Sequence, residues 1–194
     1  MLLDYGADPA VKSVHGGRSA TAMAARKGRG DVLAVMKQRG IDLKLEGVDV
    51  LIAACAMADH GAILALTEDQ PQLVAELVAE GGTLLAEFAG NGNTEGVRCL
   101  LDVGVDAGAL FKESDIYFDI AEGGTALHAA AWRAWPETVK LLVERGAPVN
   151  AIDGKGRSAL ALAVRACVDS YWTDRRSPDS VEALLKAGAS LDWD

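Results

Sequence analysis

Residues 124–153, with the sequence GTALHAAAWRAWPETVKLLVERGAPVNAID, decide which fold the chain can adopt, because they predict two short helices in succession. A run of small residues forms the first helix, and Pro136 suits the first position of the second. Val139 and Leu142 fall at helical spacing in that second helix, and Gly146 ends it. We therefore expect a helix–turn–helix unit, with an extended segment after it.

The same arrangement recurs along the chain. Counted from Thr125, alanines follow at positions 5 and 6, apolar residues at 14 and 17, and glycine at 21. Repetition at a period of about 20–50 residues is typical of proteins in which each repeat covers the apolar face of its neighbour. The pattern begins again at Ser19, Asp49, Thr83 and Ser158, with Gln70 in place of the Asp49 unit's glycine and nine extra residues inside the Ser158 unit.

The unit at 124–153 resembles one ankyrin repeat. It departs from the family pattern at Ala126 for proline, Ala134 for the inter-helix glycine and Pro148 for aspartate. The resemblance implies an all-α solenoid of five helix pairs with a leading partial repeat and short or absent hairpin strands. The residues that match the pattern are Gly123 or Gly124, Thr125, Leu127, His128, Ala130, Ala131, Gly146, Ala147, Val149 and Asn150.

We use the terms inner helix and outer helix for the first and second helix of each pair, and finger for the segment that leads to the next pair. The predicted organisation is one ankyrin-repeat domain over 1–194, with a partial repeat at 1–16 and complete repeats at about 17–46, 47–82, 83–123, 124–155 and 156–194. Because the partial repeat lacks its inner helix, we expect the chain to be a fragment of a longer repeat protein. The basic residues at 26–39 are interpreted as a solvated outer face.

Three segments depart from a regular array. Apolar residues at helical spacing between Pro71 and Gly81 predict an extra helix where a finger would normally project. The finger at 107–122 is longer than the others and carries six large apolar residues among acidic ones, so we expect it to dock on the inner helices or on a partner. The last repeat has an insertion around 167–177, between its two helices.

Composition and charge narrow the class of partner. The net charge of −9 argues against nucleic acid or an anionic membrane surface as the main partner. No apolar run is long enough to predict a membrane-spanning helix. Cys55 and Cys99 occupy helix positions that should face the stack, and with Cys167 they make an odd number. Reduced thiols are the favoured interpretation, and a cytoplasmic setting follows from it.

The sequence shows no motif that predicts catalysis. By resemblance, His128 is the histidine of the ankyrin motif, whose usual role is hydrogen bonding between neighbouring loops. His15 and His60 have no partners at the spacing of a metal or catalytic site. There is no nucleophile elbow and no phosphate-binding glycine loop. We therefore predict that the chain is not an enzyme and holds no cofactor and no metal.

Two groups of residues are candidates for contact with a partner, because aromatic residues and arginine are enriched where proteins bind one another. Aromatic residues also fill the gaps that insertions create, so packing is an alternative interpretation for Trp132 and Trp135. The candidates are Phe111, Tyr117 and Phe118 in the long finger, and Trp132, Arg133, Trp135, Tyr171, Trp172 and Arg175 at the turns of the last two repeats.

Equivalent turns of successive repeats are neighbours in a solenoid, so the second group should form one cluster. The insertion at 168–177 is expected to fold over Trp132 or Trp135. One of four arginines is expected to stack on an aromatic ring, namely Arg133, Arg165, Arg175 or Arg176.

We predict a non-enzymatic protein–protein interaction module that binds a protein partner through its inner helices and fingers and is itself a monomer. Two alternatives stay open. The chain can be a spacer or regulatory segment of a larger protein, or it can bind a small ligand at the edge formed by Trp132, Trp135 and Trp172.

Overall fold

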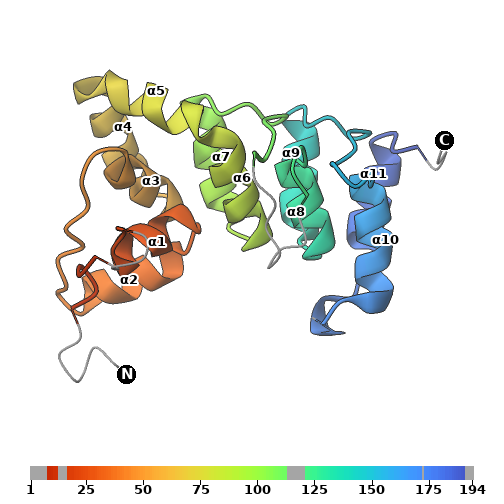
Figure 1. Cartoon of the computed structure of the whole chain (residues 1–194), viewed down its shortest axis with the longest axis horizontal. Coiled ribbons are helices and arrows are strands. Elements are labelled where there is room, and N and C mark those ends of the chain that lie inside the picture. Colours follow the sequence, from red (N-terminus) through yellow and green to blue (C-terminus); the bar gives the residue numbers. More distant parts are fainter. Residues whose placement is uncertain (1–7, 13–16, 113–120, 172, 191–194) are drawn as a thin grey trace.

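The computed structural model describes residues 8–12, 17–112, 121–171 and 173–190. Within these ranges the chain forms eleven α-helices that follow one another along a single axis (Figure 1). In the same ranges the only β-structure consists of isolated bridges, at 12 with 19, 110 with 125, and 152 with 158. The prediction of an all-α solenoid with little or no hairpin strand is confirmed.

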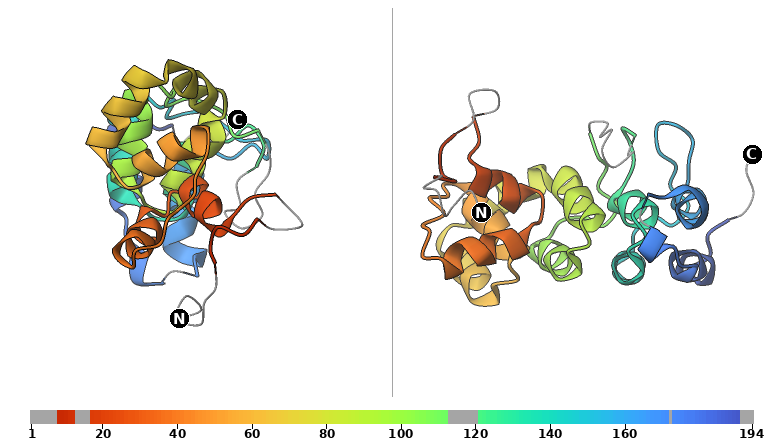
Figure 2. Two further views of the ribbon diagram at one scale, coloured as in Figure 1. Left: turned by 90° about the vertical axis from the view of Figure 1, so that its left-hand side faces the viewer. Right: turned by 90° about the horizontal axis from the view of Figure 1, so that it is seen from below.

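Ten of the helices form the five predicted pairs. The inner helices are α1 (Ala20–Arg26), α3 (Val48–Ala56), α6 (Gly81–Gly90), α8 (Ala126–Trp132) and α10 (Ala159–Asp169). The outer helices are α2 (Gly30–Gln38), α4 (His60–Asp69), α7 (Thr94–Val103), α9 (Pro136–Glu144) and α11 (Asp179–Lys186). The finger at 146–157, between α9 and α10, projects on the side of the inner helices (Figure 2, right).

Local sequence explains where several helices begin. The hydroxyls of Ser19 and Ser158 accept hydrogen bonds from backbone N–H groups in the first turns of α1 and α10. The side chains of Asp59 and Asn93 do the same for α4 and α7. These residues satisfy N–H groups that have no partner inside the helix, and each such cap stabilises a helix by about 1 kcal/mol.

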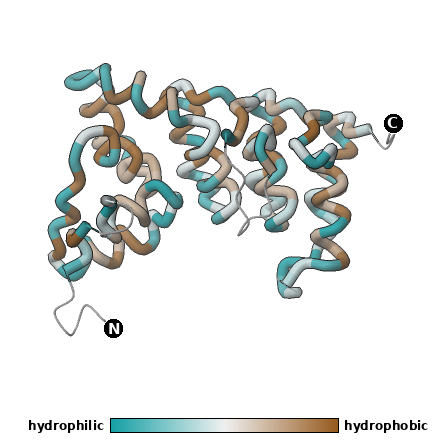
Figure 3. Tube along the Cα trace, viewed as in Figure 1, coloured by the Kyte–Doolittle hydropathy of each residue, from teal (hydrophilic) through white to brown (hydrophobic). Residues whose placement is uncertain are grey.

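The hydrophobic core extends along the array instead of having a single centre. One connected cluster of buried residues runs from α1 to α11 and includes Leu33, Leu51, Phe88, Leu127 and Leu184. Hydrophobic and hydrophilic residues are accordingly interspersed along the coloured part of the trace (Figure 3). Cys55 and Cys99 are buried in this cluster as free thiols, which confirms their predicted position.

The predicted extra helix is present as α5 (Pro71–Ala79). Pro71 is its first residue, and Leu73 and Leu77 are buried by contact with the neighbouring helices. Because α5 runs almost directly into α6, there is no projecting finger between the second and third pairs (Figure 1).

The helix pairs before and after α5 stack differently. The inner helices α6, α8 and α10 pack directly on one another, as expected for a regular solenoid. The inner helix α3 instead packs on α1, α5 and α7 and has little or no contact with α6. The helices α1 and α2 run across the direction shared by α8 and α10 (Figure 1). The outer helix α4 has no buried residue. A groove of about 530 Å³ therefore lies between α3, α4 and the segment at 40–45.

The interpretation of the basic residues at 26–39 as a solvated face is wrong for Arg26, whereas Lys27 is exposed although it is ion-paired. The guanidinium of Arg26 lies 2.6 Å from Asp49 of α3 and 2.5 Å from Glu80, and its side chain is only 15% exposed. Lys27 pairs with Glu87 of α6. These cations bind carboxylates that lie 23 to 60 residues further along the chain, so no local pattern could assign them.

Candidate partner-binding surface

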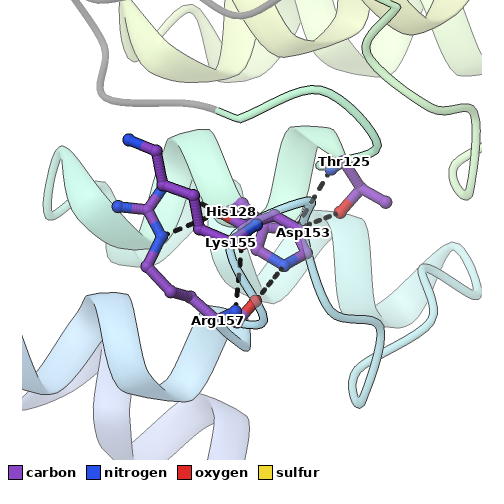
Figure 4. Close-up of polar contacts among 5 residues, drawn as sticks. All are labelled: Thr125, His128, Asp153, Lys155 and Arg157. Atoms are coloured by element: carbon purple, nitrogen blue, oxygen red, sulfur yellow. Dashed lines mark hydrogen bonds and ion pairs between the residues drawn. The ribbon is translucent and has the colours of Figure 1, made fainter.

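The base of the finger at 146–157 is held by His128, which is 1% exposed (Figure 4). Its Nδ1 accepts a hydrogen bond of 3.1 Å from the backbone N–H of Thr125, and Nδ1 and the Thr125 hydroxyl are 3.0 Å apart. Because Nδ1 accepts, the ring proton is on Nε2, which donates to the carbonyl oxygen of Arg157 at 3.1 Å. His128 thus joins the start of α8 to the end of the finger, in the bracing role that the resemblance implies.

Asp153 fixes the finger itself, and its side chain is completely inaccessible. Its carboxylate accepts from the backbone N–H groups of Lys155 and Arg157 at 2.9 and 3.0 Å. The guanidinium of Arg157 also donates to it, at 2.8 and 2.7 Å (Figure 4). Burial alone would raise the pKa of Asp153, but these hydrogen bonds hold that pKa below its usual value. Four hydrogen bonds to one carboxylate leave the turn little freedom to move.

Adjacent fingers are also joined to each other. The side-chain amide of Asn150 donates to the carbonyl oxygen of Gly188 at 3.2 Å, and its oxygen accepts from the N–H of Ser190 at 2.8 Å. Asn150 belongs to the ankyrin-like motif, so the motif residues of one repeat order the finger of the next.

The long finger is docked through Phe111, which is 4% exposed and packs between Ala86 of α6 and Ala129 of α8. Its backbone N–H donates to Gly124 at 2.7 Å and its carbonyl oxygen accepts from Gly123 at 2.9 Å. Docking on the inner helices is therefore found for Phe111, which is buried against this chain. Tyr117 and Phe118 lie outside the described residues.

A glycine makes this docking possible. A Cβ atom built on Gly82, in the first turn of α6, would lie 2.1 Å from the carbonyl oxygen of Leu110. Only glycine allows the finger backbone to approach the helix this closely, and no local pattern indicates that Gly82 has this role.

The tryptophans and arginines at the turns of the last two repeats do come together. The guanidinium carbon of Arg175 lies 4.3 Å from the ring centroid of Trp135, and that of Arg165 lies 4.7 Å from Trp132. Both are cation–π contacts. The insertion thus contacts Trp135 through Arg175, as predicted. Arg165 lies inside α10 and not in a turn, because that helix continues to Asp169.

The other members of this group differ in exposure. Arg133 is buried, Tyr171 is 91% exposed, and Trp172 lies outside the described residues. The indole N–H of Trp135 donates to the carbonyl oxygen of Gly90 at 3.0 Å, so Trp135 also joins the fourth pair to the third. Packing therefore accounts for Trp132 and Trp135 through contacts within the chain.

A polar cleft of about 430 Å³ lies beside this edge. Arg133 lines it together with the turns at 28–31 and 91–93, whereas neither Trp132 nor Trp135 does. No local sequence pattern indicates this cleft, because its walls come from turns of the first, third and fourth pairs and from Ala56 at the end of α3.

The thiols of Cys55 and Cys99 offer no accessible nucleophile. Burial raises the pKa of Cys55 to about 12 and also raises the pKa of Cys99, so neither forms a thiolate readily near neutral pH. In the part of the chain that the structure describes, no three His, Cys, Asp or Glu side chains are close enough to hold a metal ion. No described helix has the length and apolar composition to cross a membrane.

Stacked helix pairs, buried finger bases and a distributed core define the class of helical-repeat solenoids. A family model described as ankyrin repeats (3 copies) matches residues 85–192, which is more than half of the chain. The chain belongs to the ankyrin-repeat family. The match covers the three helix pairs that stack regularly and does not include the pairs before α5.

Known proteins similar to this chain match less than half of it. Inversin of Danio rerio is 38% identical over 85 residues, which are 44% of this chain and 7% of that protein. Serine/threonine-protein kinase 12 of Arabidopsis thaliana is 36% identical over 85 residues, again 44% of this chain and 17% of the kinase. Inversin of Gallus gallus is 42% identical over 72 residues, which are 37% of this chain and 6% of that protein. The chain therefore spans less than a fifth of each relative, and the alignments concern a helical segment of much longer proteins.

Proposed function

We propose that the chain is a non-enzymatic module that binds a protein partner across its inner helices and fingers. Ankyrin repeats are in general protein–protein interaction modules, and the family is shown here. The observation that carries the proposal is the docking of Phe111 between α6 and α8, which joins the base of the long finger to the inner helices.

The rigidity of that surface supports the proposal. His128 and Asp153 hold one finger through buried hydrogen bonds, and Asn150 joins it to the next. A surface that is already ordered loses little conformational entropy when a partner binds. The identity of the partner depends on exposed side chains that differ among family members.

The proposal that the chain is not an enzyme is supported by the burial of His128, Cys55 and Cys99. His128 is 1% exposed and has both ring nitrogens in hydrogen bonds. Cys55 and Cys99 are also buried, with raised pKa values. None of the three side chains can contact a substrate in this conformation. We further propose that the protein is a cytoplasmic monomer, with no nucleic acid or membrane as its main partner.

Crosslinking tests the proposal directly. The purified chain is incubated with lysate of the cells that encode it and crosslinked, and the crosslinked residues are identified by mass spectrometry. We expect crosslinks to the retained partner on inner helices and fingers. Crosslinks confined to the outer helices would contradict the proposal.

Finger variants sharpen this experiment. Deletion of residues 108–120 removes the buried Phe111, so a gentler variant replaces 113–120 with a Gly-Ser linker of equal length and keeps Phe111. The matched control, Glu137→Ala with Lys140→Ala, removes an exposed ion pair from the outer helix α9 without changing net charge. Loss of the partner in the linker variant but not in the control would support the finger as part of the binding surface.

Small-ligand binding at the tryptophan edge is a second candidate, and the polar cleft beside that edge is the observation in its favour. The rings of Trp132 and Trp135 already contact Arg165 and Arg175, so the cleft, and not a ring face, would hold the ligand. A thermal-shift screen with metabolites and sugars tests it, since a ligand of the native state raises the melting midpoint. Arg133→Ala should abolish any shift that arises there.

A role as spacer or regulatory segment of a larger protein also stays a proposal. In Inversin of Danio rerio and in the Arabidopsis kinase, the similar region is 7% and 17% of the protein. The reading frame that surrounds the coding sequence tests it, because a stop codon directly upstream of Met1 would contradict it.

A further inference from the structure

The structure contains a hollow of about 430 Å³ between the first and third helix pairs, which we call the α1–α6 pocket. Arg18, Arg26 and Lys27 line it from α1 and the residues just before that helix, and Lys112 lines it from the long finger. The end of α5, the first two turns of α6 and Phe111 form the remaining wall. The pocket thus lies on the surface proposed above for partner binding, where a finger meets the inner helices.

The irregular stacking explains why this pocket exists. Because α3 packs on α1, α5 and α7 and has little or no contact with α6, it leaves a space between α1 and α6. Because α5 replaces a finger, no projecting hairpin stands between the second and third pairs. The contact between α1 and α6 therefore depends on side chains that reach across, such as Lys27 to Glu87.

The charges in the pocket do not cancel. Arg26 is neutralised by Asp49 and Glu80, and Lys27 by Glu87. Arg18 and Lys112, by contrast, are both exposed and form no ion pair with any residue that the structure describes. The uncompensated charge of the pocket is therefore positive, in a chain whose net charge is −9.

The charges and apolar atoms of the pocket indicate which kind of side chain it can bind. A hollow lined by one sign of uncompensated charge attracts the opposite charge, and its low-dielectric walls strengthen the field. The exposed Ala79, with the accessible edges of the buried Leu84 and Phe111, gives one wall an apolar surface, and Thr83 adds a hydroxyl. An acidic side chain next to an apolar one matches both features. A long nucleic acid would meet the acidic remainder of the chain and is disfavoured.

We propose that the α1–α6 pocket binds an aspartate or glutamate side chain of an extended partner segment, with Arg18 and Lys112 as the residues that recognise the carboxylate. The proposal rests on the function proposed above and names the kind of partner that the surface accepts. Charge complementarity of this kind contributes to specificity and to the rate of association.

The test begins with short random peptides displayed on phage and selected on the intact chain. One selected peptide is then synthesised with a fluorescent label and its affinity is measured by polarisation. We expect the selected peptides to contain aspartate or glutamate beside an apolar residue. We also expect the affinity to fall as salt is added, because salt screens the attraction.

Two double variants locate the site. Arg18→Glu with Lys112→Glu should weaken binding by about tenfold or more. The control, Lys37→Glu with Arg39→Glu, makes the same change in net charge at two exposed residues at the end of α2, outside the pocket, and should change the affinity less than about twofold. All four positions are exposed, so folding should be retained, and circular dichroism checks this.

Changing the acidic residue of the peptide distinguishes the pocket proposal from the proposed partner-binding function. Replacing its acidic residue with the corresponding amide should weaken binding to the wild type but not to the Arg18→Glu, Lys112→Glu variant. Peptides that bind this variant as tightly as the wild type would overturn the pocket proposal and leave the partner-binding function standing. Displacement by inorganic phosphate, but not by chloride at equal ionic strength, would show a general anion site and would also overturn it. Failure to select any peptide would count against both proposals.

Discussion

The side-chain amide of Asn93 donates a hydrogen bond of 2.7 Å to the carbonyl oxygen of Gly28, which lies 65 residues earlier in the chain. The same nitrogen donates at 2.7 Å to Ala56, so the turns of the first three helix pairs meet at one side chain. In a regular solenoid a turn contacts those of the adjacent pairs. Here the first pair contacts the third as well, and this contact lies in the wall of the polar cleft that Arg133 lines.

Asn93 has two separable roles, and Asn93→Asp distinguishes them. The Asn93 oxygen caps α7 by accepting from Gly96 at 2.8 Å, and a carboxylate would keep that bond. The donor to Gly28 and Ala56 would be lost. We expect the free energy of unfolding to fall by about 1–3 kcal/mol, measured by urea denaturation, because two partly buried carbonyl oxygens lose their partner.

The opposite isosteric change at another helix start is the control for this prediction. Asp59 caps α4 through Ala62, and no other hydrogen bond of its side chain is found among the described residues. Asp59→Asn should therefore change the stability by less than about 0.5 kcal/mol. Equal losses of unfolding free energy in Asn93→Asp and Asp59→Asn would show that the hydrogen bonds from Asn93 to Gly28 and Ala56 do not stabilise the fold.

Two glycines near the starts of outer helices should respond in opposite ways to alanine. A Cβ atom on Gly30 of α2 would lie 1.9 Å from the carbonyl oxygen of Ala56, so Gly30→Ala must displace the backbone. We expect a loss of about 3 kcal/mol in unfolding free energy. Gly61 of α4 has only Asp59 Oδ1 nearby, at 3.7 Å. Gly61→Ala should be neutral or stabilise by up to about 1 kcal/mol. Thermal melts of the two variants, measured in parallel, test both predictions. A Gly30→Ala variant as stable as the wild type would show that the start of α2 is not in close contact with Ala56.

The role assigned to His128 predicts a loss of stability and a specific dependence on pH. His128→Ala leaves the N–H of Thr125 and the carbonyl oxygen of Arg157 without their partner, so we expect a loss of about 1–3 kcal/mol. Burial lowers the pKa of His128 below its usual value, although the hydrogen bond to Arg157 and the charge of Asp153 act in the opposite direction.

The sign of the pH effect follows from that shift. Below about pH 6.5 the unfolded chain protonates this histidine while the folded chain does not, so acidification favours unfolding. Stability should therefore fall as pH drops from 6.5 towards the lower pKa of the folded state, by up to about 1.4 kcal/mol per pH unit. His128→Gln should remove this slope. Asp153 does not obscure it, because the stability that its lowered pKa provides is lost only below about pH 4. A wild type and a variant with equal slopes between pH 7 and 5 would refute the buried, neutral state of His128.

Local patterns in the sequence predicted the helices well, because the signals for helix starts and stops lie within a few residues of each other. Pro71 and the glycines after α5 predicted an extra helix, and it is present. The long-range contacts were not predictable in this way. Arg26 is paired with Glu80 and not solvated, and Asn93 bridges turns that no repeat period brings together. Both follow from the displacement of α3, which depends on how α5 packs.

The sequence indicated which segments form the candidate site, but not which individual residues make its contacts. The apolar content of the long finger indicated docking, but the sequence could not show that Phe111 would be the buried residue or that Gly82 would receive it. The tryptophans and arginines could be assigned to one edge, because equivalent turns of successive repeats are neighbours. Which arginine stacks on which ring was left open, since several lie within reach.

The contact between Arg175 and Trp135 can be tested by mutation. The guanidinium lies 4.3 Å from the ring centroid, on a segment that joins α10 to α11 and holds the short 3-10 helix η2 (Thr173–Arg175). Arg175→Ala and Trp135→Phe, alone and together, form a double-mutant cycle. We expect a coupling of about 0.5–1 kcal/mol at this exposed edge. Trp135→Phe alone should lower the free energy of unfolding more than Arg175→Ala, because it also removes the hydrogen bond of the indole N–H to Gly90.

Hydrogen exchange adds a local readout: Arg175→Ala should increase amide exchange at 173–177 and leave exchange in α8 and α9 unchanged. A coupling of zero, with unchanged exchange at 173–177, would show that the insertion is held in place by other contacts, such as the two hydrogen bonds that Arg176 donates to the carbonyl oxygen of Ser170.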